Sequence, residues 1–257
     1  MNQLVDRTIT ALRAEHDVLS GLVRTLTDDQ LAVTSGAAEW TVAQALSHLG
    51  SGAEIGRAPI ARAAGETVAA EDNPTIWARW DSSAPRAQAE GFLEHNGRWL
   101  ETVEALTPEQ RSSLTVDLGF LPEPVPLLTA VGMRLSEVAN HSWDVRVAFD
   151  PAAGVDAGSA EVLVDLLTGP VGFMLSFLAK PAELAKPASV AVPGAALVID
   201  DGVTVVTDLE SPSATFHGPA EAFVRLVSGR LKAPYDQGVT VEGSVTLDDL
   251  RRVFPGF

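Results

Sequence analysis

The sequence predicts an α+β protein of two domains, in which a four-helix bundle is followed by a small α+β domain. Hydrophobic residues recur at helical spacing up to about residue 180, whereas beyond about residue 186 they form short β-branched runs bounded by proline and glycine. The chain has 257 residues and 46% hydrophobic content, which is enough for one large core or two ordinary ones. We therefore place the domains at residues 1–180 and 186–257, separated by a segment with two Lys-Pro pairs.

Four long amphipathic helices account for the first 150 residues. They are expected at residues 2–26, from residue 41 onward, at 85–106 and at 125–149. The second helix has the clearest start, because the Thr41 hydroxyl can cap it while Gln44 reaches back to complete a capping box. Trp40 precedes this cap and is expected to pack on the first helical turn. A proline-rich, hairpin-like piece at 118–126 leads into the last helix of the bundle.

The remaining third of the chain predicts a bridging helix and a small sheet. The helix at 158–179 is expected to bridge the two domains and to break at Gly169-Pro170. Asp201-Gly202 predicts a two-residue hairpin between two strands. Short helices are expected at 219–228 and from residue 248. The expected strands are 189–192, 196–200, 203–206, 214–217 and 239–243.

The amino-acid composition argues against several classes of function. A formal net charge of -16 argues against binding nucleic acid or an anionic membrane through a general electrostatic field. The chain has no cysteine, so disulfides, thiolate metal sites, iron–sulfur clusters and a protein-borne thiol nucleophile are excluded. Any sulfur chemistry therefore needs a bound small molecule.

We expect no targeting segment, and the motifs of common catalytic loops do not occur in the sequence. The N-terminal residues do not follow a signal-peptide pattern, and the most apolar stretch, 163–178, is interrupted by Asp165 and Gly169-Pro170. We therefore expect a cytoplasmic protein without a membrane span. Neither a phosphate-binding glycine motif nor a G-x-S-x-G turn occurs.

Histidines are the best metal ligands left in a chain without cysteine. Glu137 and His141 are four residues apart on one predicted helix, so their side chains project from one face a turn apart. His48 lies on the apolar stripe of the second helix and is expected to point into the bundle. Two imidazoles and one carboxylate leave an open coordination position, as in catalytic zinc sites. The alternative interpretation is a surface ion pair or a hydrogen-bonded core histidine.

The other histidines have simpler explanations available. His16, on the first helix, is interpreted as a polar-face or capping residue and His95 as a half-exposed helix residue. His217 is expected to satisfy local backbone groups at a strand end. A position near the metal for His16, and an acid–base role for His95, are the alternatives.

Two segments of the sequence resemble a known family. Residues 39–49 (EWTVAQALSHL) resemble the entry to the second helix in the DinB-like superfamily, in particular its mycothiol-dependent maleylpyruvate isomerase family. Residues 135–146 (LSEVANHSWDVR) are similar to that family's second signature, E-x-x-x-H-x-x-D. The two segments occur in the family's order, and residues 216–231 are similar to part of its small α+β domain.

The resemblance implies a divalent metal, most often zinc, held by His48, Glu137 and His141, and the thiol cofactor mycothiol. It implies an isomerase, whose thiolate adds to a cis double bond and leaves after rotation, or an S-transferase acting on a small electrophile or unsaturated acid. Nickel, manganese and iron also suit this ligand set. Alternatives are a non-catalytic metal- or ligand-binding protein of the DinB-like fold and a hydrolase that uses zinc-bound water.

Asp144 and Arg230 complete the predicted site as candidate catalytic residues. Asp144 follows His141 by three residues and can accept a hydrogen bond from its second ring nitrogen. An ion pair with Arg146 or Arg98 is the alternative. Arg230 matches an arginine in the family's G-R-[LV] segment, which implies that it binds a carboxylate of the substrate or thiol cofactor. The alternative for Arg230 is an ordinary surface arginine.

Overall fold

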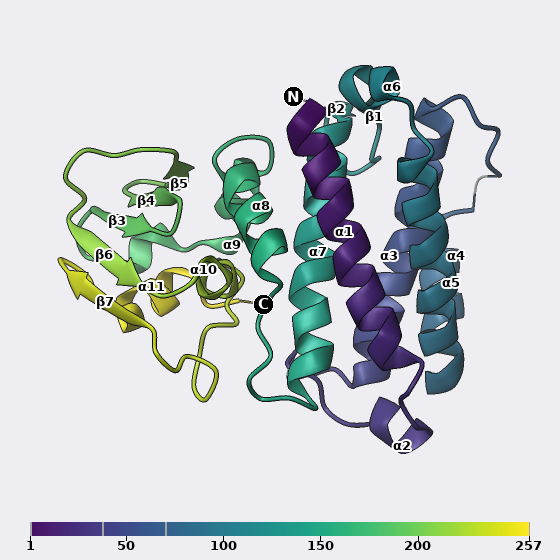
Figure 1. Ribbon diagram of the computed structural model, residues 1–257, viewed down its shortest axis with the longest axis horizontal. Coiled ribbons are helices and arrows are strands. Elements are labelled where there is room, and N and C mark those ends of the chain that lie inside the picture. The colour runs from purple at the N-terminus through teal and green to yellow at the C-terminus, as the bar shows by residue number, and fades with distance from the viewer. Residues whose placement is uncertain (1, 38, 70, 257) are drawn as a thin grey trace. The chain divides into compact units, whose positions relative to one another are not determined.

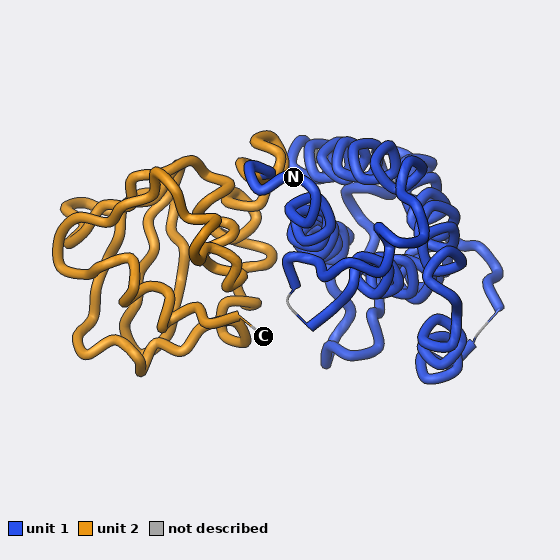
Figure 2. The backbone as a smooth tube through the Cα atoms, turned by 90° about the horizontal axis from the view of Figure 1, so that it is seen from below, with its two compact units in different colours: residues 1–153 blue, residues 154–257 orange. Residues whose placement is uncertain are grey.

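The computed structural model describes residues 2–37, 39–69 and 71–256. The chain forms two compact units, residues 1–153 and 154–257 (Figure 2). The first unit is helical apart from one two-stranded ribbon, and the second contains a five-stranded sheet (Figure 1). The predicted α+β class, with a helical N-terminal part and a strand-rich C-terminal part, is thereby confirmed.

The first unit is built on four long helices, each close to its predicted position. α1 packs against α7 and α5, and α3 packs against the same two helices, so that the four enclose a common core (Figure 1). Each contributes an apolar face to that core. The helices are α1 (Asn2–Val23), α3 (Val42–Ala63), α5 (Pro85–Glu104) and α7 (Leu127–Val147).

Short elements connect these helices, and the short helices among them are not predicted by the sequence. Thr27, expected to lie where the first helix ends, instead caps a separate short helix, because its side chain accepts from the Gln30 amide. The connections contain α2 (Asp28–Leu31), α4 (Asn73–Asp81), α6 (Pro108–Ser113), β1 (Thr115–Val116) and β2 (Val125–Pro126). β1 and β2 pair antiparallel immediately before α7, in agreement with the expected hairpin-like piece.

The start of α3 confirms the predicted capping box. The Gln44 amide donates to Thr41 Oγ1 at 3.2 Å, and the Thr41 amide donates to Gln44 Oε1 at 2.9 Å. Two of the helix's otherwise unpaired amide groups are thereby satisfied. This fixed start sets which residues of α3 face the core and which face α7 and solvent.

The second unit contains the sheet in the order β5-β4-β3-β6-β7. β3 and β6 are parallel, and every other neighbouring pair is antiparallel. The Phe216 and Phe223 rings meet edge to face at 6.3 Å, which packs α10 against the sheet. The strands and terminal helices are β3 (Ala188–Val192), β4 (Ala195–Ile199), β5 (Val203–Val206), β6 (Ala214–His217), β7 (Thr240–Gly243), α10 (Ala220–Val227) and α11 (Leu247–Val253).

One predicted turn differs from the structure. β4 and β5 are joined by three residues, 200–202, rather than by the expected pair Asp201-Gly202, since Ile199 pairs with Val203. The Gly202 amide donates to Asp200 Oδ1 at 3.0 Å. The Asp200 side chain thus stabilises the loop by accepting a hydrogen bond from within it.

The expected bridging helix is also arranged differently. It divides at the predicted break into α8 (Ala157–Leu167), a 3₁₀ turn (Gly172–Met174) and α9 (Leu175–Leu178), followed by a second 3₁₀ turn (Pro181–Glu183). α8 packs against α10 and belongs to the second unit, whereas the sequence analysis had assigned it to the first domain. Among the described residues no single helix is long and apolar enough to cross a membrane, although α8 and the 172–178 segment, bent by 84°, pass that test together.

Candidate metal centre

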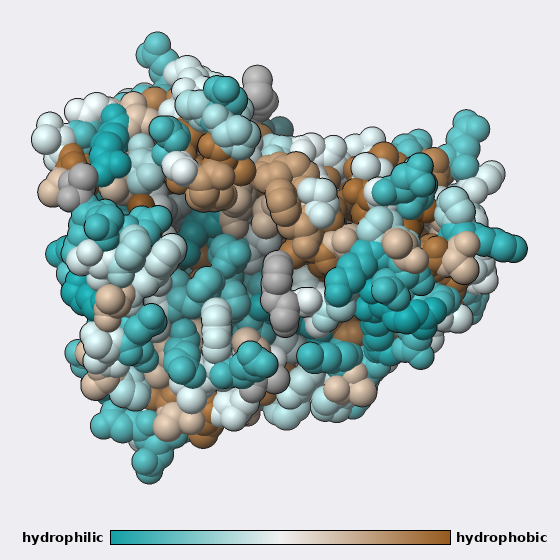
Figure 3. Space-filling model, turned by 180° about the vertical axis from the view of Figure 1, so that it is seen from behind, coloured by the Kyte–Doolittle hydropathy of each residue, from teal (hydrophilic) through white to brown (hydrophobic). Residues whose placement is uncertain are grey.

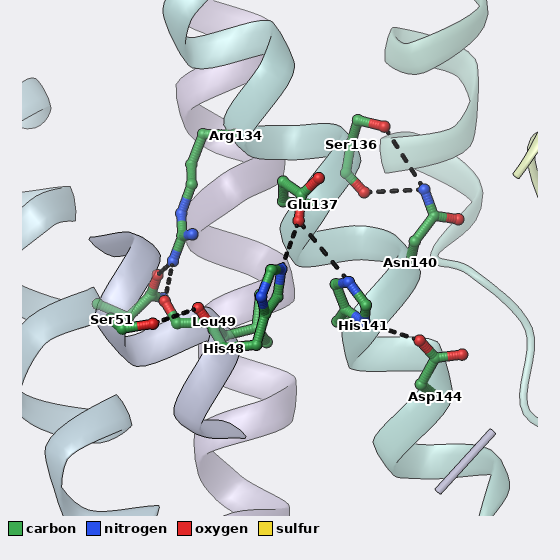
Figure 4. Close-up of polar contacts among 10 residues, drawn as sticks. His48, Leu49, Ser51, Arg134, Ser136, Glu137, Asn140, His141 and Asp144 are labelled. Carbon is green, nitrogen blue, oxygen red and sulfur yellow. Dashed lines mark hydrogen bonds and ion pairs between the residues drawn. The ribbon is translucent and has the colours of Figure 1, made fainter. Parts of the chain in front are cut away.

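The three predicted metal ligands come together at one place in the first unit. Figure 4 shows His48 on α3 facing Glu137 and His141 on α7. One ligand atom from each residue lies within 4.8 Å of the other two. His48 Nε2 is 2.9 Å from Glu137 Oε2, and His141 Nε2 is 3.7 Å from the same oxygen. Three donors thus converge on a space suited to one cation.

His48 is more open than the sequence predicted. Its side chain is 43% exposed, so it lies at the edge of the bundle and not in the interior. Its neighbours Leu46 and Leu49 are fully buried and occupy the core side of α3. His48, between them along the chain, is therefore turned toward α7 and solvent. This placement leaves the cluster accessible to a small molecule.

Asp144 contacts His141 in the predicted way. His141 Nδ1 lies 2.8 Å from Asp144 Oδ2, and the aspartate side chain is fully buried (Figure 4). A proton on Nδ1 shared with this carboxylate leaves the lone pair of Nε2 directed at Glu137. The backbone of Asp144 is held as well, because its carbonyl accepts the Gly36 amide at 2.7 Å.

Trp40 covers the two histidine rings. Its ring centroid is 5.0 Å from that of His48 and 5.6 Å from that of His141, with the second pair stacked. The two imidazoles meet edge to face at 4.7 Å. Trp40, which is expected to pack on the first turn of α3, thus restricts the rotation of both imidazole rings.

Glu137 remains ionised well below neutral pH. Desolvation raises the pKa of its carboxyl group, but the hydrogen bond with His48 and the charges of His141, His48 and Arg134 outweigh it and lower the pKa to about 2. The side chain is 45% exposed, which accords with a carboxylate that keeps part of its hydration. The cluster thus contributes one full negative charge toward a cation.

Arg134 is a residue of this region that the sequence analysis missed. It lies one turn before Glu137, is 8% exposed, and donates from Nη2 to the Leu49 carbonyl and to Asn96 Oδ1, both at 2.7 Å. Burial lowers its pKa to about 10, so it is still a cation at neutral pH. The sequence does contain a signal for Arg134, because it is a charged residue within the predicted buried stripe of α7, three residues before Glu137.

The other histidines lie outside the cluster. His16 is 6% exposed and is held by Asn96 and Ser20, so its expected polar-face position is wrong. His95, on α5, lies 3.7 Å from Glu54 Oε2 and edge to face with the Trp80 ring. His217 is half-exposed on β6, 3.6 Å from Glu242.

Arg230 belongs to the second unit. It follows the turn after α10, and its Nη1 donates to the Ser228 carbonyl at 3.2 Å. Gly229 precedes it with a φ of +73°, and a Cβ there would lie 2.2 Å from Gly256 Cα. The turn therefore requires glycine, whereas the carboxylate-binding role of Arg230 stays a prediction.

Comparison with known proteins decides the family. Residues 12–146, which include the three candidate ligands and Asp144, match the model of the mycothiol maleylpyruvate isomerase N-terminal domain. The chain belongs to this family. A comparison with curated proteins gave no match.

Two solved structures share the fold of this family member. They are the mycothiol-dependent maleylpyruvate isomerase and a histidine-to-alanine mutant of it, with TM-scores of 0.61 and 0.62. Each is 17% identical, and the match covers 94% of both chains in each case. The similarity thus extends beyond the N-terminal domain and includes both units of the fold.

Proposed function

We propose that this family member is a metal-dependent enzyme that uses mycothiol to isomerise a small cis-unsaturated acid. The convergence of His48, Glu137 and His141 on one space, with Asp144 behind His141, carries the proposal. Two imidazoles and a carboxylate fit zinc and leave a position for a further ligand. When bound, zinc lowers the pKa of a coordinated thiol, so that a thiolate exists at neutral pH.

The chain's own residues prepare this site. Glu137 supplies a negative charge at neutral pH, and Asp144 orients His141 so that its Nε2 faces Glu137. Trp40 fixes both imidazole planes. These contacts lower the cost of ordering the ligands when the cation binds.

Arg230 is proposed to bind a carboxylate of the substrate. A guanidinium offers a planar fork of donors that matches a carboxylate in a bidentate pair. We expect Arg230→Lys to raise KM for an acid substrate more than it changes kcat, and Arg252→Lys, at an exposed site of the same unit, to leave both unchanged.

The test combines metal analysis with turnover. Purified protein is expected to hold one zinc ion per chain and to convert a cis-unsaturated acid to its trans isomer only when mycothiol is present. His48→Ala and His141→Ala should lose the metal and the activity together, whereas His217→Ala on β6 should retain both. An absence of bound metal in the wild-type protein would contradict the proposal.

The same assays separate the alternatives. Release of a thioether product identifies an S-transferase, and turnover without mycothiol identifies a hydrolase. Binding of metal and thiol without turnover of any electrophile or unsaturated acid identifies a binding protein of this fold.

A further inference from the structure

A second feature of the first unit is a cavity of about 490 Å³, lined by the later part of α3, by α4 and α5 and by the segment 117–120. None of the three candidate metal ligands lines it. Seen from behind, the molecule has a hollow whose walls are mainly hydrophilic, with hydrophobic atoms along part of its rim (Figure 3). Pockets of roughly 300–1,000 Å³ hold small organic ligands. The cavity is therefore large enough for a ligand of its own.

Most of the ionisable side chains that line the cavity already have a partner. The pairs, with N–O distances of 2.7 to 3.8 Å, are Glu54 and Glu71 with Arg79, His95 with Glu54, Arg98 with Glu94, and Arg57 with Glu66. Two groups of the lining differ. Arg62 makes no side-chain hydrogen bond or ion pair with another described residue. Asp117 accepts the Gly119 amide through Oδ1 at 2.9 Å, and its Oδ2 has no partner within the described ranges. The cavity thus offers one open cation and one open carboxylate oxygen.

A proline in α3 adds an acceptor to the same cavity. Pro59 lies inside the helix and has no N–H group, so the Ile55 carbonyl, four residues earlier, lacks the donor that a helix normally supplies. Ile55 and Pro59 both line the cavity. An ammonium group has several N–H donors and can bind a carboxylate and a carbonyl together. Asp117 and the Ile55 carbonyl therefore suit an ammonium group, whereas the planar fork of Arg62 suits a carboxylate.

Apolar side chains lie among these polar groups. Ile76 is 5% exposed, and Val68 and Leu118 are half-buried in the lining. Phe120, also in the lining, is 68% exposed, so most of its ring is open to a ligand. A ligand with apolar side chains gains free energy when it removes these surfaces from water.

We propose that this cavity is a second ligand site, separate from the metal centre, for a small zwitterion with apolar side chains and about the size of a dipeptide. Its carboxylate pairs with Arg62, and its ammonium group binds Asp117 and the Ile55 carbonyl. Its side chains pack on Ile76 and Phe120. A purely anionic or purely cationic ligand leaves one of the two open charges unpaired. The proposal is independent of the metal and the thiol, because none of these residues belongs to the metal centre.

Calorimetric titration of the wild-type protein with the dipeptide leucyl-phenylalanine tests the proposal. We expect saturable binding. The C-terminal amide of this dipeptide lacks the carboxylate, and its N-acetyl form lacks the ammonium group. Each should bind about tenfold more weakly, because a charge-assisted hydrogen bond is lost. Failure of the dipeptide to bind, or equal affinities for the three ligands, overturns the proposal.

Two substitutions assign the two charges. Arg62→Ala should weaken binding of the dipeptide about tenfold and leave the affinity for the amide unchanged, because the amide has no carboxylate to lose. Asp117→Asn, which keeps an oxygen to accept from Gly119, should weaken binding of the dipeptide and leave the affinity for the N-acetyl form unchanged. An equal loss for all three ligands in either variant overturns the proposal.

Three further variants locate the site. Ala58→Trp places a large ring in the cavity and should abolish binding, with circular dichroism to confirm that the variant is folded. Arg24→Ala, at an exposed arginine of the same unit, should bind as the wild type does. His48→Ala should lose zinc but retain dipeptide binding, so this proposal and the proposed function can fail independently. Binding that a folded Ala58→Trp retains, or that a folded His48→Ala loses, overturns the second site.

Discussion

Two of the polar clusters in the helical bundle, those around His48 and His16, differ in what surrounds the imidazole ring. His48 at the metal centre is 43% exposed, and its Nε2 faces a carboxylate and a second imidazole. His16 is 6% exposed, and Asn96 and Ser20 lie within hydrogen-bonding distance of its ring nitrogens. The first cluster keeps donor atoms for a ligand, whereas the second uses its hydrogen-bonding capacity internally.

One residue links the two clusters. Arg134 donates to Asn96, whose amide lies 2.7 Å from His16 Nδ1, and to the carbonyl of Leu49, which follows His48 in the chain. The buried network therefore reaches the backbone beside the metal centre. We infer that the buried cluster around His16 supports the exposed cluster around His48. The following predictions test this inference.

The largest expected effect is that of Arg134→Met. It removes the two buried hydrogen bonds from Arg134 to the Leu49 carbonyl and to Asn96 Oδ1, which should lower the free energy of unfolding by about 3 kcal/mol. Urea denaturation measures this change, with the exposed Arg24→Met as control. If the buried network around His16 supports the metal centre, the zinc affinity of Arg134→Met, measured by chelator competition, also falls. An unchanged unfolding midpoint would contradict the supporting role.

The next effect concerns pH and His16. Burial is the main cause that lowers the pKa of His16 to about 4, from 6.5 for an unperturbed histidine. Between these values the unfolded chain binds a proton that the folded chain does not, so stability falls as pH falls. The contribution of His16 is about 2 kcal/mol on going from pH 7.5 to pH 5.

Urea denaturation at several pH values checks this prediction. His16→Gln should reduce the loss of stability between pH 7.5 and pH 5, because glutamine does not titrate. His217→Gln, at a half-exposed histidine of the second unit, should leave the pH dependence as in the wild type. If the free energy of unfolding depends on pH equally in His16→Gln and the wild type, the buried His16 does not cause the loss of stability at low pH.

The smallest expected effect is that of Asp144→Asn. Zinc affinity should fall by about tenfold, because a neutral amide holds the Nδ1 proton of His141 less firmly than the carboxylate does. Competition with a chromogenic chelator measures the affinity, and circular dichroism confirms that the variant is folded. Asp81→Asn, at the exposed end of α4, is the matched control. Equal affinities for Asp144→Asn and the wild type would show that His141 is oriented by other contacts.

Local patterns predicted most of the fold. The capping box of Thr41 and Gln44 defined the start of α3, and β-branched runs defined all five strands of the sheet to within one residue at each end. The short elements α2, α4 and α6 were missed because they are too short to show a hydrophobic period. The assignment of α8 failed for another reason. The apolar face of a helix does not specify which element packs against it. For α8 that element is α10, which begins more than fifty residues later in the chain.

The sequence by itself determined the residue types and spacing of the candidate site. The Glu137 and His141 pair follows from helical periodicity, and the absence of cysteine assigns any reactive sulfur to a bound molecule. Only the tertiary structure decided that His48 meets this pair at the bundle's edge, and that His16 and Arg134 are enclosed in a network of their own. The physical reason is that exposure and hydrogen-bond partners depend on neighbouring helices, which one helix's sequence does not specify.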